Sequence, residues 1–92
     1  GPGEIEDCLI SHPAVALAGV IGVPDPLYRE VGEAYVLRRP DVALEADEIA
    51  RWCRDRLANY KVPKRFVVCD TLPMLPVGKI DKAQLKRQSA SA

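Results

Sequence analysis

Apolar residues recur along the chain with the period of a helix in two segments. Residues 4–11 (EIEDCLIS) predict a short helix that ends before Pro13, because three apolar residues share one face: Ile5, Cys8 and Leu9. Residues 46–58 predict the clearest helix, since apolar residues recur at i, i+3, i+4 and i+8: Ile49, Trp52, Cys53 and Leu57. The arginines between them are expected to form its solvated face.

Three further segments have the apolar character of strands. Residues 15–23 (VALAGVIGV) are apolar at consecutive positions, as in a strand buried between two layers. Residues 33–39 (EAYVLRR) and 65–70 (RFVVCD) predict two more strands. Residues 24–32 contain two prolines and a glycine and are expected to form a loop. Residues 82–88 predict a last short helix capped by Asp81, with two residues packed inward: Ala83 and Leu85.

The predicted order of elements is helix, strand, strand, helix, strand and helix. This order predicts a small α+β domain, a three-stranded sheet with helices packed on it. Residues 1–3 (GPG) have the character of an expression-tag remnant, residues 4–88 form the expected domain, and residues 89–92 are expected to fray. We expect the domain to be a part of a longer protein.

The composition is that of an ordinary globular protein, with 48% hydrophobic and 28% charged residues. Thirteen basic residues balance thirteen acidic ones, so charge gives no argument for a nucleic-acid partner. No apolar run is long enough for a membrane span, which needs about 20 residues. The three widely spaced cysteines predict reduced, mostly buried thiols of a cytoplasmic protein and no zinc site or disulfide: Cys8, Cys53 and Cys69.

The candidate chemistry lies in residues 72–82 (LPMLPVGKIDK). Pro76 stiffens this segment and Gly78 permits a sharp turn, so the loop can present Lys79 as a single cation. An ammonium suits a phosphate or a developing oxyanion, although a surface turn with a solvated lysine explains the same pattern. The segment is not a P-loop, because Pro73 stands where a glycine is needed and Ile80 where Ser or Thr is needed. His12 and Trp52 are expected to be structural.

Four segments, in order along the chain, match the motifs of one known family: Glu4-Ile5-Glu6 with His12-Pro13 and Val15; Val20-Ile21-Gly22-Val23-Pro24-Asp25 with Gly32-Glu33; Leu57-Ala58 with Tyr60-Lys61-Val62-Pro63; and Leu72-Pro73 with Gly78-Lys79-Ile80. On these residues the chain resembles the C-terminal domain of the AMP-forming adenylating enzymes. These are the acyl- and aryl-CoA synthetases, the luciferases and the peptide-synthetase adenylation domains. The match covers nearly all of the chain after residue 3.

The resemblance implies that Lys79 is the catalytic residue. In this family the lysine enters the active site during adenylate formation and contacts the carboxylate, the phosphate under attack and the ribose. Gly78 and Pro76 are then assigned to loop geometry. ATP, Mg²⁺ and CoA act in the full-length enzyme, and none is expected to bind this fragment, which carries no metal site and no assigned cofactor-binding residue. The implied partner is the missing N-terminal adenylation domain, against which a large rotation moves the lid for thioester formation. The fragment alone is expected to be inactive.

Two other interpretations remain open on the sequence. The segment Tyr60-Lys61-Val62-Pro63 is more similar to CoA ligases, but residues 78–82 are similar to peptide-synthetase domains, which load a carrier protein. A non-catalytic interaction module is the third hypothesis, with Lys79 as a docking or modification site. By resemblance, lysine acetyltransferases and deacetylases are then possible partners.

Overall fold

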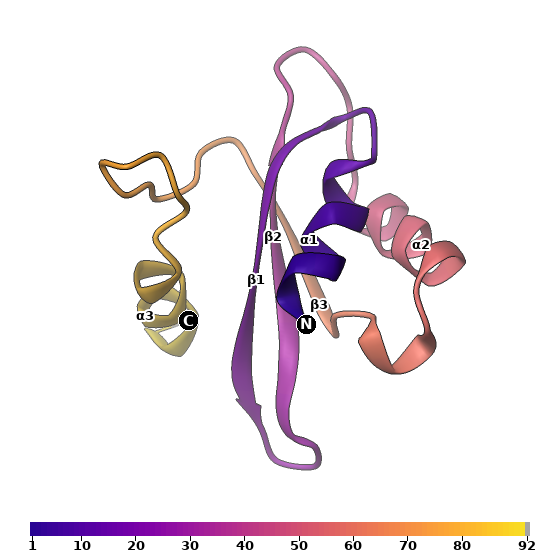
Figure 1. The fold of residues 1–92 in the computed structure, drawn as a ribbon, viewed down its shortest axis with the longest axis vertical. Helices are drawn as coiled ribbons and strands as arrows, with labels where there is room; N and C mark the ends of the chain where they lie inside the picture. Colours follow the sequence, from indigo (N-terminus) through magenta and orange to yellow (C-terminus); the bar gives the residue numbers. More distant parts are fainter. Residues whose placement is uncertain (92) are drawn as a thin grey trace.

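The computed structural model describes residues 1–91, whose centre is a three-stranded sheet with helices on both faces (Figure 1). Its strands are β1 (Val15–Asp25), β2 (Arg29–Arg38) and β3 (Arg65–Cys69), in the spatial order β1-β2-β3. β1 runs antiparallel to β2, and β2 runs parallel to β3. The sheet is therefore mixed, with β1 and β3 at its edges, and the predicted α+β fold is confirmed.

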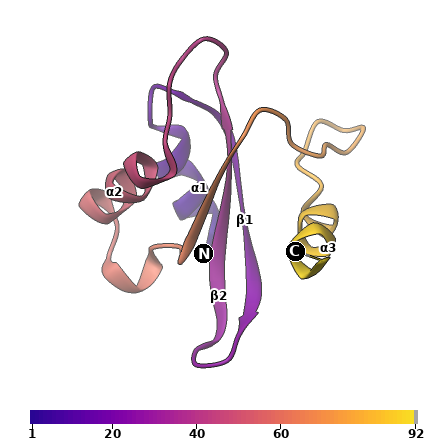
Figure 2. The ribbon, with the colours of Figure 1, turned by 180° about the vertical axis from the view of Figure 1, so that it is seen from behind.

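The helices are divided between the two faces of the sheet. α1 (Pro2–Ile10) and α2 (Ala46–Arg56) cover one face, and α3 (Lys82–Ser91) covers the other (Figures 1 and 2). A 3₁₀ turn at Asn59–Lys61 leads from α2 into β3. Because β2 and β3 are parallel, the chain needs a crossover between them, and α2 lies in that crossover.

Each face of the sheet has its own apolar cluster. The cluster under α1 and α2 is the larger, and its buried members are Leu9, Ala14, Val15, Ala18, Val20, Ala34, Val36, Leu44, Ile49 and Cys53. The cluster under α3 has three buried members, Ile21, Tyr35 and Leu85, with Ile80 and Leu72 packed against it. Neighbouring residues of β1 thus enter different clusters, which explains why this strand is apolar at consecutive positions.

The prediction of a loop at residues 24–32 is wrong. β1 continues to Asp25 and β2 begins at Arg29, so the two strands form a hairpin with a tight turn. The Asp25 carboxylate accepts the backbone N–H groups of Leu27 and Tyr28, at 3.0 and 2.9 Å, and these bonds lower its pKa. Pro24 does not interrupt pairing, because β1 is an edge strand and a proline is tolerated there.

Several helix ends differ from the predicted ones. α1 starts at Pro2, a favourable residue for a first helical turn, so two of residues 1–3 are helical. α2 ends at Arg56, two residues earlier than predicted. α3 continues to Ser91, so the tail predicted to fray is helical through that residue, and Ala92 lies outside the described part. Ala83 is exposed, since a residue two positions from the buried Leu85 points to another side of the helix.

His12 and Trp52 join the end of α1 to α2. The Ala14 N–H donates to Nδ1 of His12 at 3.0 Å, so the ring proton resides on Nε2, which lies 2.8 Å from Oε2 of Glu48. The Trp52 ring packs edge-on against His12, and its Nε1–H donates to the Cys8 carbonyl at 3.0 Å. These contacts are those of packing residues, as expected.

The three cysteines are free thiols. Cys53 is fully buried, and burial together with the neighbouring Cys8 raises the pKa of its thiol to about 12. Burial also raises the pKa of Cys69. Within residues 1–91, no helix has the length and apolar character to cross a membrane.

Candidate functional site

The segment that contains Lys79 folds into a small hairpin between β3 and α3. Met74 and Ile80 form an antiparallel bridge, and the Leu75 N–H donates to the Lys79 carbonyl at 2.7 Å. The Gly78 N–H donates to the Leu75 carbonyl at 2.9 Å and closes the turn, in which Pro76 follows Leu75. A proline suits this position because its φ is already that of the turn. The backbone on both sides of Lys79 is therefore hydrogen-bonded.

Gly78 adopts a left-handed φ of 89°, which L-residues rarely adopt. A Cβ added to this glycine would meet nothing within 4 Å. The hairpin thus needs glycine for its backbone conformation and not for lack of space. A turn followed by a left-handed glycine is a common way to close a hairpin, and Lys79 is the residue directly after that glycine.

The hairpin is attached to the domain next to Lys79. Ile80 packs into the cluster under α3, so close to β1 that a Cβ on Gly19 would lie 3.2 Å from the Ile80 Cδ1 atom. The Asp81 N–H donates to the Pro73 carbonyl at 2.8 Å, and its carboxylate caps α3 by accepting the Gln84 N–H at 3.0 Å. The base of the hairpin is therefore fixed by apolar packing and by a helix cap.

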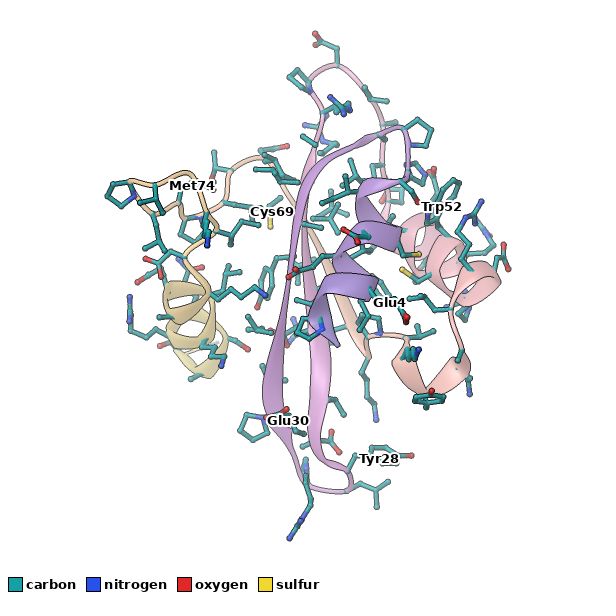
Figure 3. All side chains as sticks on the ribbon, in the orientation of Figure 1. Glu4, Tyr28, Glu30, Trp52, Cys69 and Met74 are labelled. Atoms are coloured by element: carbon teal, nitrogen blue, oxygen red, sulfur yellow. The ribbon has the colours of Figure 1, made fainter. Side chains whose placement is uncertain are left out.

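Lys79 itself is exposed, and within residues 1–91 its ammonium forms no ion pair or hydrogen bond. The apolar residues around it are exposed too: Met74 at 43%, Leu75 at 40% and Val77 at 77%. Figure 3 shows Met74 on this hairpin, away from the sheet. Sequence reasoning missed this apolar rim, although three apolar residues on the two sides of Pro76 were a signal for it. The three predicted residues, Pro76, Gly78 and Lys79, do lie together on one turn.

A cavity of about 610 Å³ is lined by the hairpin, by β1, by the start of α3 and by Glu6 of α1. Four of its lining residues are charged: Glu6, Lys79, Asp81 and Lys82. A second cavity, of about 530 Å³, lies between the β1–β2 hairpin and α3, where Glu33 is 2% exposed. The Glu33 carboxylate accepts hydrogen bonds from the hydroxyls of Tyr35 and Ser89. Its Oε2 atom lies 3.2 Å from the Arg65 Nη1 atom. Burial and the hydrogen bond to Glu33 raise the pKa of Tyr35.

The hairpin can supply one cation and an apolar rim, but little more. No three side chains of His, Cys, Asp or Glu within residues 1–91 lie close enough together to hold a metal ion. Fold and site together define a small mixed-sheet domain with one exposed lysine on a hydrogen-bonded hairpin.

Comparison with known proteins gives the family. The model of the AMP-binding enzyme C-terminal domain matches residues 4–79, and the chain belongs to this family. The chain is 44% identical over 87 residues to a CoA ligase of Rhodococcus jostii that acts on a methyl-dioxo-octahydroindenyl propanoyl group. The aligned region covers 95% of this chain and 17% of that protein. It is 45% identical over 86 residues to the 2-succinylbenzoate–CoA ligase of Bacillus subtilis, at 92% and 17% coverage.

Solved structures agree with this assignment. A fatty acyl CoA synthetase of Mycobacterium tuberculosis superposes with a TM-score of 0.86 at 37% identity, over 98% of this chain and 18% of that one. The fold is that of the C-terminal domain of acyl-CoA synthetases. The chain spans about a sixth of the length of these relatives, 17–18%.

Proposed function

We propose that residues 4–88 are the C-terminal lid domain of an AMP-forming carboxylate–CoA ligase, and that Lys79 enters the active site for acyl-adenylate formation. The observation that carries this proposal is an exposed lysine without an ion-pair partner, among residues 1–91, on a hydrogen-bonded hairpin. Its backbone is already ordered, so inserting the ammonium into a neighbouring cleft costs little further backbone entropy, and the remaining cost is that of the side chain. Residues 1–3 are proposed to be a tag remnant.

The chemistry of the first half-reaction needs such a cation. A carboxylate attacks the α-phosphate of ATP, the acyl–phosphate bond forms, and pyrophosphate leaves. Both reactants are anions, and the transition state spreads negative charge over the phosphate oxygens. A preorganised cation offsets that charge, and the loss of such a group typically costs about 10²–10³ in rate. A lysine serves this role as a compact charge on a flexible stem.

Most of the active site lies outside this chain on our proposal. ATP and Mg²⁺ are bound mainly by an N-terminal adenylation domain, where Mg²⁺ neutralises charge on the phosphate oxygens. The carboxylic acid is bound there too. The residues described here contribute Lys79 and the loop geometry of Gly78 and Pro76.

We further propose that the domain rotates as a rigid body between the two half-reactions. In one orientation the apolar rim of Met74, Leu75 and Val77 packs on the N-terminal domain and Lys79 is inserted. In the other orientation Lys79 is withdrawn and the acyl acceptor reaches the adenylate. We prefer CoA to a carrier protein as that acceptor, because the relatives cited above are named CoA ligases.

The experiment is Lys79→Ala in the full-length enzyme that contains this chain. ATP–pyrophosphate exchange, which reports adenylate formation, should fall about 10²–10³-fold. Thioester formation from supplied acyl-adenylate should be largely retained. Lys86→Ala is the matched control, since Lys86 is an exposed lysine of α3, and it should affect neither half-reaction. Equal losses in both half-reactions for Lys79→Ala would refute the assignment.

The exposure of Lys79 also makes it accessible to modification. We propose that acetylation by a cytoplasmic lysine acetyltransferase removes its charge and so stops adenylation, and that a deacetylase reverses this. The three free thiols fit such a reducing compartment. Mass spectrometry of the enzyme from its native cells tests this, and Lys79 without any acylated fraction under all growth conditions would contradict it.

A further inference from the structure

We propose that the ion pair between Lys82 and Glu6 positions the hairpin that presents Lys79. Glu6 and Lys82 would then be positioning residues for adenylate formation, acting through Lys79 without contacting the substrate. This inference rests on the function proposed above for Lys79, and it adds two residues to which the sequence gave no role.

The ion pair between Lys82 and Glu6 is short, and the Glu6 oxygen in it also accepts a backbone hydrogen bond. The Lys82 Nζ atom lies 2.7 Å from the Glu6 Oε2 atom. The same oxygen accepts the backbone N–H of Val20 at 2.8 Å. The Glu6 side chain is 20% exposed and the Lys82 side chain 40%, so the carboxylate is the more shielded partner of the pair. An acceptor that is held by a backbone donor and partly desolvated can fix a lysine, whereas a fully exposed pair contributes little.

The ion pair lies at the β1 edge of the sheet, where it joins residues from the two faces. β1 is an edge strand, and the Val20 N–H that binds Glu6 is one of its backbone donors not used by β2. Glu6 belongs to α1 on one face, while Lys82 begins α3 on the other (Figures 1 and 2). The ion pair therefore connects the two helical layers directly beside the Lys79 hairpin.

The position of the pair explains why the hairpin needs it. On the α3 side, the hairpin is held by the packing of Ile80. On the α1 side, Glu6, Lys79 and Lys82 line the cavity of about 610 Å³. The Lys82–Glu6 ion pair is the polar contact that crosses beside this cavity, from the start of α3 to α1. The packing of Ile80 and the Asp81 cap hold the base of the hairpin. Without the ion pair, this base could tilt about them, and Lys79 would move with it.

Glu6 also separates the roles of two neighbouring lysines. Lys82 is three residues beyond Lys79 and lines the same cavity. Its charge is engaged by Glu6, so Lys79 is left as the ammonium without a partner on the hairpin, among residues 1–91. The pair thus fixes both the direction of the hairpin and the identity of the cation that it offers.

The test uses Lys82→Gln in the full-length enzyme, with Lys82→Arg as the conservative variant and Lys86→Gln as the matched control on the same helix. A misplacement of about 1 Å can cost up to about 10²-fold in rate, so Lys82→Gln should lower kcat for ATP–pyrophosphate exchange by about 10-fold or more. The thermal midpoint and thioester formation from supplied acyl-adenylate should change little. Lys82→Arg should restore exchange, because a guanidinium also reaches a carboxylate. Lys86→Gln should resemble the wild type.

The outcomes separate this inference from the proposed function. If Lys79→Ala abolishes exchange and Lys82→Gln does not, the inference is wrong and the proposed function stands. If Lys82→Gln lowers both half-reactions together with the thermal midpoint, the pair is merely structural and the inference is also wrong. If Lys79→Ala leaves exchange intact, the proposed function itself fails.

Discussion

The replacement Gly78→Ala tests how the hairpin is built. Gly78 has a φ of 89°, and an alanine in the left-handed region costs about 1–2 kcal/mol. Alanine also restricts the unfolded chain, which returns about 0.4–1 kcal/mol. No atom lies within 4 Å of the added Cβ, so no clash adds to these two effects. The free energy of unfolding should therefore fall by up to about 1.6 kcal/mol, and by about 0.8 kcal/mol at the middle of both ranges.

Urea unfolding of the chain measures this change, and Gly3→Ala is the matched control. Gly3 also has open space around an added Cβ, but it lies in α1 and has no left-handed φ. Gly3→Ala should leave the stability unchanged or raise it slightly, because alanine favours a helix. If Gly78→Ala proved as stable as Gly3→Ala, the left-handed turn next to Lys79 would be refuted.

Two further predictions concern the core. Leu85→Ala should lower the free energy of unfolding by about 2–5 kcal/mol in the same urea assay, because Leu85 is 1% exposed and fills the cluster under α3. A loss below about 1 kcal/mol would mean that α3 is not packed on the sheet. Cys53 should resist alkylation by iodoacetamide at pH 8.5, as measured by mass spectrometry, because its pKa of about 12 keeps the thiol protonated and only the thiolate reacts. Unfolding the chain in denaturant should make Cys53 reactive. Rapid alkylation of Cys53 in the folded chain would contradict the prediction.

The periodic segments were predictable from sequence because their packing follows their spacing. In α2, Ile49 and Cys53 are buried one turn apart, as the apolar spacing indicated. The β1–β2 hairpin was not predictable in this way. Pro24 and Pro26 are strong signals of a loop, and only the position of β1 at the sheet edge makes Pro24 compatible with strand pairing.

The sequence predicted which residues form the candidate site, but not the side-chain contacts around them. The Gly78–Lys79 pair and its proline pointed to a constrained loop with a cation. The absence of a partner for Lys79 among residues 1–91, and the Lys82–Glu6 contact, depend on side chains from opposite ends of the chain. No local pattern encodes such a contact, because it arises only when α1 and α3 meet at the edge of β1.

A structure of the full-length enzyme with its carboxylic acid and a non-hydrolysable ATP analogue, in the absence of CoA, tests the central claim most directly. Without the acceptor, the complex should adopt the orientation for adenylate formation. We predict that the Lys79 ammonium lies within hydrogen-bonding distance, about 3 Å, of an oxygen of the acid or of the α-phosphate. A Lys79 side chain directed into solvent, while both ligands occupy the active site, would contradict the account.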